Sequence, residues 1–146
     1  MNSESFQIRR IGPGGDTADA FAVRRAVFIG EQGIAPEIEL DGRDAAAVHY
    51  VAVRDGRVVG TARIRGLGPG RIKVERVAVL AEARRHGIGR RIMQCLLDDA
   101  AAEGMRRVEL SAQLYVADFY RGLGFAADSD PYDEVGIPHV HMVRDL

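Results

Sequence analysis

Three β-rich runs in the middle of the chain, separated by turn residues, constrain the fold most. They comprise residues 49–53, 57–65 and 71–79. Asp55-Gly56 lies between the first two runs, and this dipeptide between two such runs is a strong hairpin signal. Three glycines and a proline in residues 66–70 make the next turn. The runs therefore predict an antiparallel meander, and the alternation of apolar and charged residues along the third predicts that one face is buried.

The rest of the chain predicts helices and strands on both sides of this meander. In order, these are a strand at 6–11, a helix at 17–30, an irregular helix and loop at 31–44, a helix at 87–103, a strand at 108–111, a short helix at 117–123, and strands at 125–127 and 139–143. Asp16 or Thr17 would cap the first helix, which would turn Arg24 and Arg25 toward a wetter face. The order predicts an α/β (α+β) fold with a mixed, mostly antiparallel sheet.

Composition fits one soluble domain and argues against several classes of protein. The chain has 146 residues, with 20 Lys+Arg against 21 Asp+Glu, so we expect a single domain over residues 1–146 and no nucleic-acid partner. No apolar run approaches the roughly 18 residues of a membrane span, and no export signal opens the chain. The one cysteine, Cys95, can form neither an internal disulfide nor a Cys-based zinc site. These features predict a cytoplasmic protein with no membrane partner.

A strand–loop–helix segment after the meander carries the clearest sign of chemistry. Gly87 and Gly89 open a helix directly after Arg84, Arg85 and His86. The first N–H groups of a helix are free and lie at its positive end, and glycine lets a ligand approach the backbone closely. Such a loop can bind a phosphate or pyrophosphate, although neither a Walker loop nor a complete G-x-G-x-x-G is present. A glycine-rich turn with solvated arginines would explain the same spacing.

This loop and a second motif resemble the GCN5-related N-acetyltransferases (GNAT). Residues 84–89, R-x-x-G-x-G after the strand 75–79, are similar to the acetyl-CoA loop of that family, and residues 117–125 resemble its A-x-x-F-Y-x-x-x-G-F signature. Shorter pieces resemble the ElaA-like or YjcF-like subgroup: residues 27–33, Asp41 with Asp44 and His49, and residues 60–63, 112–113 and 136–142. One departure is Leu114, beside Gln113, where many members have an asparagine that contacts pantetheine.

The resemblance, which covers nearly the whole chain, implies a fold and an activity. It implies a GNAT-type sheet of six to seven strands flanked by about four helices. It also implies an N-acetyltransferase that moves an acetyl group from acetyl-CoA to a primary amine by direct attack in a ternary complex. The partners would be acetyl-CoA, a small-molecule amine and, in a homodimer, a second copy of the chain, with no metal. A non-catalytic acyl-CoA sensor and a nucleotide-binding module are the alternatives.

The family pattern also implies roles for individual residues. Tyr120 would protonate the leaving thiolate, and its neighbour Phe119 would pack against the cofactor or the core. The cofactor-binding set comprises Val77, Ala78, Val79, Arg84, Arg85, His86, Gly87, Ile88, Gly89, Arg90, Gln113 and Phe119. Glu75, on the strand that would line the site, is the candidate base, acting directly or through water; a surface or ion-paired carboxylate is the equally weighted alternative. The presence of both Tyr120 and Glu75 favours an enzyme.

Two groups of polar residues are candidates for the acceptor side. The predicted substrate-binding residues are Glu31, Gln32, His139 and His141. The two histidines alternate on a strand and so share a face, but they lack a third ligand and predict no metal site. An acidic patch that could select an amine comprises Glu31, Gln32, Asp41 and Asp44. A solvated loop is the plainer interpretation of that patch.

Overall fold

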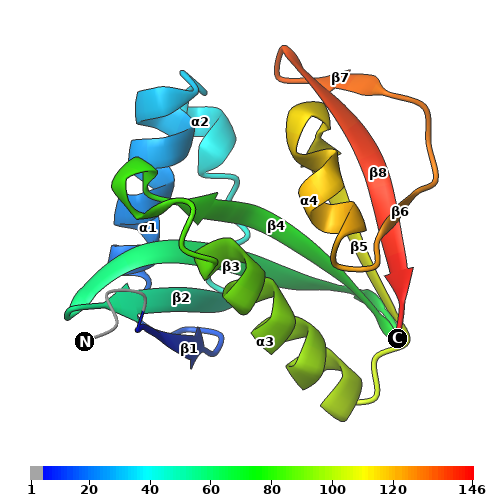
Figure 1. Ribbon diagram of the computed structural model, residues 1–146, viewed down its shortest axis with the longest axis horizontal. Coiled ribbons are helices and arrows are strands. Elements are labelled where there is room, and N and C mark those ends of the chain that lie inside the picture. The colour runs from blue at the N-terminus through cyan, green and yellow to red at the C-terminus, as the bar shows by residue number, and fades with distance from the viewer. Residues whose placement is uncertain (1–4) are drawn as a thin grey trace.

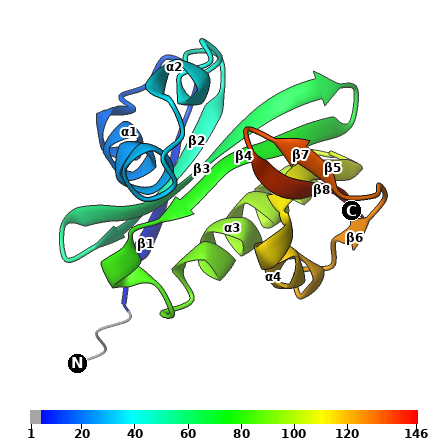
Figure 2. The ribbon, with the colours of Figure 1, turned by 90° about the horizontal axis from the view of Figure 1, so that it is seen from above.

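The computed structural model describes residues 5–146, which form a twisted sheet with helices on both faces (Figure 1). The strands are β1 (Gln7–Ile11), β2 (Val48–Arg54), β3 (Arg57–Gly68), β4 (Arg71–Val79), β5 (Arg107–Gln113), β6 (Ala126–Ala127), β7 (Tyr132–Glu134) and β8 (Ile137–Asp145). The helical segments are α1 (Ala18–Arg24), the π-helical η1 (Arg25–Glu31), α2 (Pro36–Glu39), the 3-10 turns η2 (Ala81–Ala83) and η3 (Leu114–Val116), α3 (Ile88–Ala102) and α4 (Ala117–Arg121). Figure 2 shows α1 and α2 on one face of the sheet and α3 and α4 on the other.

The strand order confirms the predicted mixed, mostly antiparallel sheet. The order is β1-β2-β3-β4-β5-β8-β6, with β7 paired to β8, and β4–β5 is the parallel pair. The segment between β6 and β8, where no strand was predicted, contains the short strand β7. The sheet therefore has eight strands where six or seven were expected. Four α-helices lie within the described residues, as predicted.

The meander forms as its turn residues predict. Asp55 and Gly56 join β2 to β3 with φ values of 53° and 75°, and positive φ at both positions gives the twist that a two-residue hairpin needs. Gly68 and Gly70, with φ of 124° and 73°, lie at the turn into β4. The three strands form most of the sheet surface against which α3 packs.

The first helix begins where it was predicted to begin, but it changes its helical form partway along. The Thr17 side chain makes no capping bond; Asp16 instead accepts a hydrogen bond from the Ala18 amide at 3.0 Å. The α-helix ends at Arg24 and continues as the π-helical η1. Arg25 is exposed as expected, but the prediction for Arg24 was wrong, since its side chain is fully buried. The guanidinium of Arg24 is covered by carboxylates that are distant in the sequence. The spacing of residues along the helix could not predict this contact, because it depends on the tertiary structure.

Helix α3 buries its apolar stripe against the sheet and thereby fixes where its own first turn lies. Ile88 and Ile92 approach β3 so closely that a Cβ added at Gly60 would lie 3.0 Å from a methyl carbon of each. Glycine at this position therefore permits the contact between α3 and the sheet. Cys95, also on this helix, is partly buried against the core. Among the described residues, no helix is long and apolar enough to span a membrane.

Candidate active site

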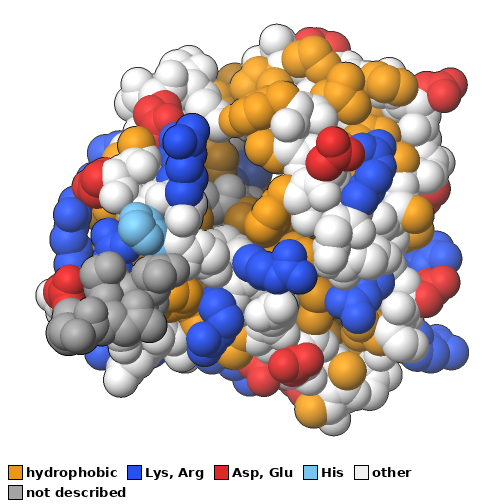
Figure 3. Space-filling view, in the orientation of Figure 1, with side chains coloured by type: hydrophobic (Ala, Val, Ile, Leu, Met, Phe, Trp, Pro, Cys, Tyr) orange, Lys and Arg blue, Asp and Glu red, His pale blue; other side chains and the backbone are white. Residues whose placement is uncertain are grey.

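The two central strands separate partway along their length, and the candidate site lies at this β4–β5 split. Residues 71–74 of β4 pair with residues 107–110 of β5, and beyond this point the two strands diverge (Figure 1). The predicted cofactor-binding strand residues, Val77 to Val79, therefore lie on β4 past the last β5 partner. In the orientation of Figure 1, the space-filling view in Figure 3 shows a hollow between the lobe of α1 and α2 and the lobe of α4 and β8.

A bulge in β4 accompanies the divergence. On β3, Thr61 pairs with Ala78 and Arg63 pairs with Glu75, so one intervening residue on β3 faces two on β4. One of those two is Arg76, whose φ of 56° is in the left-handed region. A β-bulge bends its strand and increases the local twist. The bulge thus turns the end of β4 at the position where it leaves β5.

The two motifs that resemble the GNAT family meet in space. Gly87 caps the N-terminus of α3 in a left-handed conformation, with φ of 75°. A Cβ added at Gly89, in the first turn, would lie 3.5 Å from the Phe119 ring and 3.7 Å from the Val79 side chain. The phosphate-type loop, the end of β4 and the start of α4 therefore form one corner, and all three contain residues that the resemblance assigns to the cofactor. The free N–H groups of the first turn of α3 are suited to an anion there.

Arg84, the first basic residue of the loop, is held by two partners. Its Nε donates to the Val79 carbonyl at 3.0 Å, and its terminal nitrogens bind Glu31 at 2.9 and 2.6 Å. The hydrogen bonds to Glu31 raise the pKa of Arg84 above its usual value. Both side chains are 41% exposed. The structure thus joins a predicted substrate residue to the predicted cofactor loop.

Tyr120 lies in the wall of this corner. Its ring packs edge to face against Phe119, with centroids 5.0 Å apart, and against Phe125 at 6.0 Å. Burial, with a smaller contribution from the charge of Tyr115, raises the pKa of the Tyr120 phenol. The phenol is therefore protonated at neutral pH and has a proton to donate, although a raised pKa also makes it a weaker acid than a free tyrosine.

Gln113 and Gln32 contact each other across the molecule. The Gln113 side-chain amide donates to Gln32 Oε1 at 2.9 Å, and the Gln32 amide donates back to Gln113 Oε1 at 3.4 Å. Gln113 ends β5, and Gln32 follows η1. The pair connects the far wall of the β4–β5 split to the α1 side, and it places a predicted cofactor residue beside a predicted substrate residue.

His139 and His141 share a face of β8, as predicted, and both have close partners. The Nδ1 of His139 donates to the Ile137 carbonyl at 2.7 Å, and its ring stacks on Tyr132. The ring nitrogens of His141 lie near two carboxylates, Asp128 and Glu109. In register, His139 is opposite Gln113, which places it beside the end of the split. No group of three or more His, Cys, Asp or Glu side chains in residues 5–146 could hold a metal ion.

The predicted base, Glu75, is ion-paired. Its Oε1 accepts hydrogen bonds from Arg63 at 2.9 Å and from Arg65 at 2.5 Å, and the side chain is 12% exposed. Burial alone would raise the pKa of Glu75, but the adjacent guanidinium groups of Arg65 and Arg63 outweigh it and lower the pKa. A lower pKa makes a carboxylate a weaker base. The contacts match the ion-paired alternative more closely than the role of a base.

Asp41 and Asp44 of the acidic patch bind buried arginines, which corrects the interpretation of this part as a solvated loop, whereas Glu31 lies at the exposed rim. Asp41 binds the Arg63 guanidinium at 2.8 and 2.7 Å, and Asp44 binds Arg24 at 2.6 Å and Arg63 at 3.1 Å. The full set, called here the charge network, comprises Arg24, Glu39, Asp41, Asp44, Arg63, Arg65, Glu75 and Arg76. Arg63 and Arg24 are fully buried. The prediction missed these arginines because nothing in a local sequence pattern marks partners 12 to 22 positions apart.

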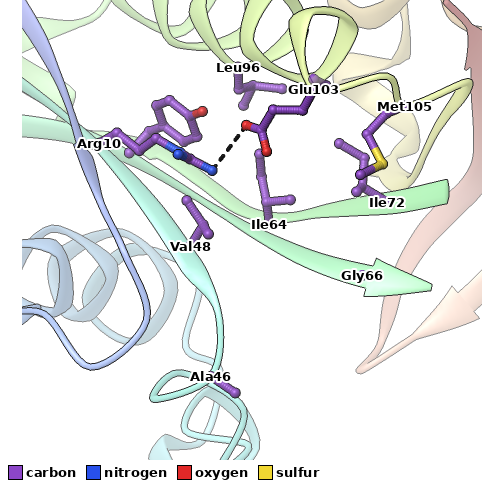
Figure 4. Close-up of a pocket in the computed structure, with 11 residues that line it drawn as sticks. Arg10, Ala46, Val48, Ile64, Gly66, Ile72, Leu96, Glu103 and Met105 are labelled. Carbon is purple, nitrogen blue, oxygen red and sulfur yellow. Dashed lines mark ion pairs between the residues drawn. The ribbon is translucent and has the colours of Figure 1, made fainter. Parts of the chain in front are cut away.

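A separate cavity of about 160 Å³ lies on the α3 side of the sheet (Figure 4). Leu96, Ile64 and Ile72 contribute apolar walls, and an ion pair of 3.1 Å joins Arg10 to Glu103 beside it. None of the predicted site residues lines it. The residues that carry the chemical motifs are thus gathered at the β4–β5 split, away from this cavity.

Comparison with known proteins agrees with this geometry. The family model of the acetyltransferase (GNAT) domain matches residues 21–146. The uncharacterized N-acetyltransferase YjcF of Bacillus subtilis is 36% identical over 128 residues, which cover 87% of this chain and 91% of YjcF. A crystal structure of an acyl-CoA N-acyltransferase from Pseudomonas aeruginosa superposes with a TM-score of 0.84 at 30% identity, covering 96% of this chain and 99% of that one. Escherichia coli ElaA superposes with a TM-score of 0.85 at 25% identity, with the same coverage of both chains.

Proposed function

The chain belongs to the GNAT family of N-acetyltransferases, and on that premise we propose that it transfers the acetyl group of acetyl-CoA to a primary amine of a small molecule or peptide. The observation that carries the proposal is the corner where Gly89, Phe119 and Val79 meet. It brings a loop suited to a pyrophosphate, an open strand and a buried phenol together at one split in the sheet. A compartment in the cytoplasm and a homodimer stay predictions.

The residues at this corner fit acetyl-CoA. The pyrophosphate would lie on the loop from Arg84 to Arg90, where Gly87 and Gly89 leave the backbone accessible and the start of α3 favours an anion. The pantetheine arm would run along Val77 to Val79, since these residues lie beyond the last β5 partner. Arg84 is exposed and charged, so phosphate oxygens could replace Glu31 as its partner.

Direct transfer needs an electrophile, a proton donor and a neutral amine. A backbone N–H of β4 would polarise the thioester carbonyl, and the amine nitrogen would then form a bond to that carbon. As the C–S bond breaks, the thiolate would take the proton of the Tyr120 phenol. The ammonium proton would leave to water or to Glu75. Because both Arg63 and Arg65 hold Glu75, a path through water is the simpler route.

Thiol release from acetyl-CoA in the presence of a mixed panel of primary amines tests the activity. The variant Tyr120→Phe removes the proposed acid and should lower kcat by about 10²-fold. Tyr115→Phe is the matched control, because Tyr115 is 75% exposed in the neighbouring turn and should leave kcat within about twofold.

Three results would contradict parts of the proposal. A wild-type rate in the Tyr120→Phe variant would remove the role of the phenol. Tight CoA binding without turnover on any amine would indicate the acyl-CoA sensor. A melting temperature raised by ATP and not by CoA would indicate the nucleotide-binding module.

A further inference from the structure

The bulge in β4 is held from outside the sheet by a partly buried ion pair between Glu39 and Arg76, whose side chains are 3% and 24% exposed. We propose that Glu39 and Arg76 are positioning residues, which fix the β4 backbone where it would polarise the thioester. The inference rests on the proposed function, since it names what holds the backbone of that same site. Neither residue was a predicted site residue.

The backbone at the bulge needs an external constraint. Arg76 has φ of 56°, and for a residue with a Cβ this left-handed conformation is disfavoured. The residue lies in the extra position of β4, opposite the single β3 residue between Thr61 and Arg63. Strain of this kind persists only where surrounding contacts over-determine it.

The Arg76 side chain supplies that constraint. Its Nε donates to Glu39 Oε2 at 2.5 Å, and a terminal nitrogen donates to the Glu39 carbonyl at 3.2 Å and to Asp41 Oδ2 at 3.4 Å. The guanidinium is thus bound by the carboxylate and the backbone carbonyl of Glu39, at the end of α2, and by the carboxylate of Asp41 just after it. The bulge is therefore tied to the layer that covers this face of the sheet.

Glu39 is itself fixed, so the constraint is stiff. Its side chain is 3% exposed, and it also accepts hydrogen bonds from Arg24 at 2.7 and 3.1 Å. Arg24 is buried at the end of α1 and binds Asp44 at 2.6 Å with another nitrogen. A chain of charge-assisted hydrogen bonds thus runs from α1 through Glu39 to Arg76, and such bonds are stronger than neutral ones.

The place of the bulge gives this constraint a consequence for catalysis. Arg76 directly precedes Val77 to Val79, the segment proposed to bind pantetheine and to direct an N–H at the acetyl carbonyl. Polarisation depends on donors aligned in advance, and a displacement of about 1 Å in a reacting geometry can cost about 10²-fold in rate. Loss of the Glu39–Arg76 pair should therefore affect kcat more than the binding of acetyl-CoA.

The test compares two isosteric changes in the charge network. Glu39→Gln removes the charge that binds Arg76 and should lower kcat about 10-fold or more, with the KM for acetyl-CoA within about threefold. Asp44→Asn is the matched control: it removes a carboxylate charge from Arg24 and Arg63, but Asp44 makes no contact with Arg76 among the described hydrogen bonds. Its kcat should stay within about threefold of the wild-type value.

A spectroscopic measurement separates positioning from a general loss of structure. The carbonyl stretch of acetyl-CoA labelled with ¹³C at the acetyl group reports polarisation directly. In the wild-type protein the bound stretch should lie below that of free acetyl-CoA. In Glu39→Gln it should move back toward the free value, while in Asp44→Asn it should stay at the wild-type position.

A second variant keeps the proposal testable if Glu39→Gln does not fold. Arg76→Gly leaves Glu39 paired with Arg24, and glycine adopts φ of 56° without strain, so folding is at less risk. Without the guanidinium the bulge is no longer held, and kcat should again fall about 10-fold with the same shift of the carbonyl stretch.

The outcomes distinguish this inference from the proposed function. A folded Glu39→Gln or Arg76→Gly variant with wild-type kcat and carbonyl stretch would overturn the inference, as would an equal loss in Asp44→Asn. Wild-type protein that shifts the carbonyl stretch but acetylates no amine would contradict the proposed function alone.

Discussion

Two sets of arginine–carboxylate pairs flank the candidate site, and they differ in their exposure to solvent. Arg84 and Glu31 pair at the rim with both side chains 41% exposed, whereas Arg24 and Glu39 pair with side chains 1% and 3% exposed. An exposed pair contributes about 0–1 kcal/mol, because solvent screens it and would solvate either partner alone. A buried pair costs several kcal/mol to break, because the remaining charge is left without water.

The difference suggests different tasks. The Arg84–Glu31 pair can exchange one partner for a ligand at little cost, which suits a loop that must accept a pyrophosphate. The buried Glu39 cannot exchange partners easily, which suits its contact with Arg76 in a backbone that must stay in a strained conformation. The following predictions test this division, from the largest expected effect to the smallest.

The largest effect should come from removing the most buried cation of the network. Arg63→Met leaves Asp41, Asp44 and Glu75 without their shared partner, so we expect the free energy of unfolding to fall by about 3–5 kcal/mol. Arg84→Met, the matched change at the rim, should lower it by less than about 1 kcal/mol. Urea denaturation of the two variants measures both values, and equal losses would break the comparison.

Acid should weaken the network more gradually, because protonation removes a charge but leaves the side chain in place. Hydrogen bonds from Arg63 hold the pKa of Asp41 far below its usual range. Burial opposes the lowering at Asp44 and Glu75, yet the hydrogen bonds and charges of their arginine partners lower both pKa values. A carboxylate whose pKa is lower in the folded state stabilises the fold fully above its unfolded pKa, and loses that contribution as the pH falls toward the folded value.

Stability should therefore be constant down to about pH 5 and should fall steeply below about pH 4, the usual range of these carboxyls. Urea denaturation between pH 3 and pH 7 measures this, with Asp44→Asn giving a shallower fall than the wild-type protein. Glu31→Gln is the control at the rim and should keep the wild-type slope. If Asp44→Asn retained the full slope, the network would not be the source of the acid sensitivity.

The same contrast explains which parts of the molecule the sequence could predict. The meander and the helix that begins after Gly87 follow from turn residues and periodicity, which are local, whereas only the resemblance to the GNAT family assigned the two motifs to one site. The charge network follows from neither, because Arg24 and Glu39 are 15 positions apart and Arg76 and Glu39 are 37 apart. Arg24 lies on a helix whose polar positions look solvated until α2 covers them. Asp41 and Asp44 likewise look like a solvated loop until the arginines are placed beside them.

At the rim, Arg84→Ala should weaken acetyl-CoA binding about 10-fold at low ionic strength, because it removes a charge-assisted contact to the pyrophosphate. The ratio of wild-type to variant affinity should shrink as salt is added, since the site is exposed. Isothermal titration at two salt concentrations measures this. Arg121→Ala is the control, because that exposed arginine pairs with Asp118 on α4 and lies outside the loop. Unchanged affinity of Arg84→Ala at low salt would contradict the placement of the phosphates.

The smallest and most diagnostic effect should come from the partner that Arg84 would give up. If the pyrophosphate replaces Glu31, then Glu31→Gln removes a competitor and should tighten acetyl-CoA binding by about two- to fivefold, the value of one exposed ion pair. If Glu31 instead stays bound and orients the guanidinium, the same variant should weaken binding. Titration of acetyl-CoA into Glu31→Gln, beside Arg84→Ala, measures the sign of this small change in affinity. Tighter binding would mean that the rim pair exchanges its partner. Weaker binding would mean that both sets of pairs hold their partners.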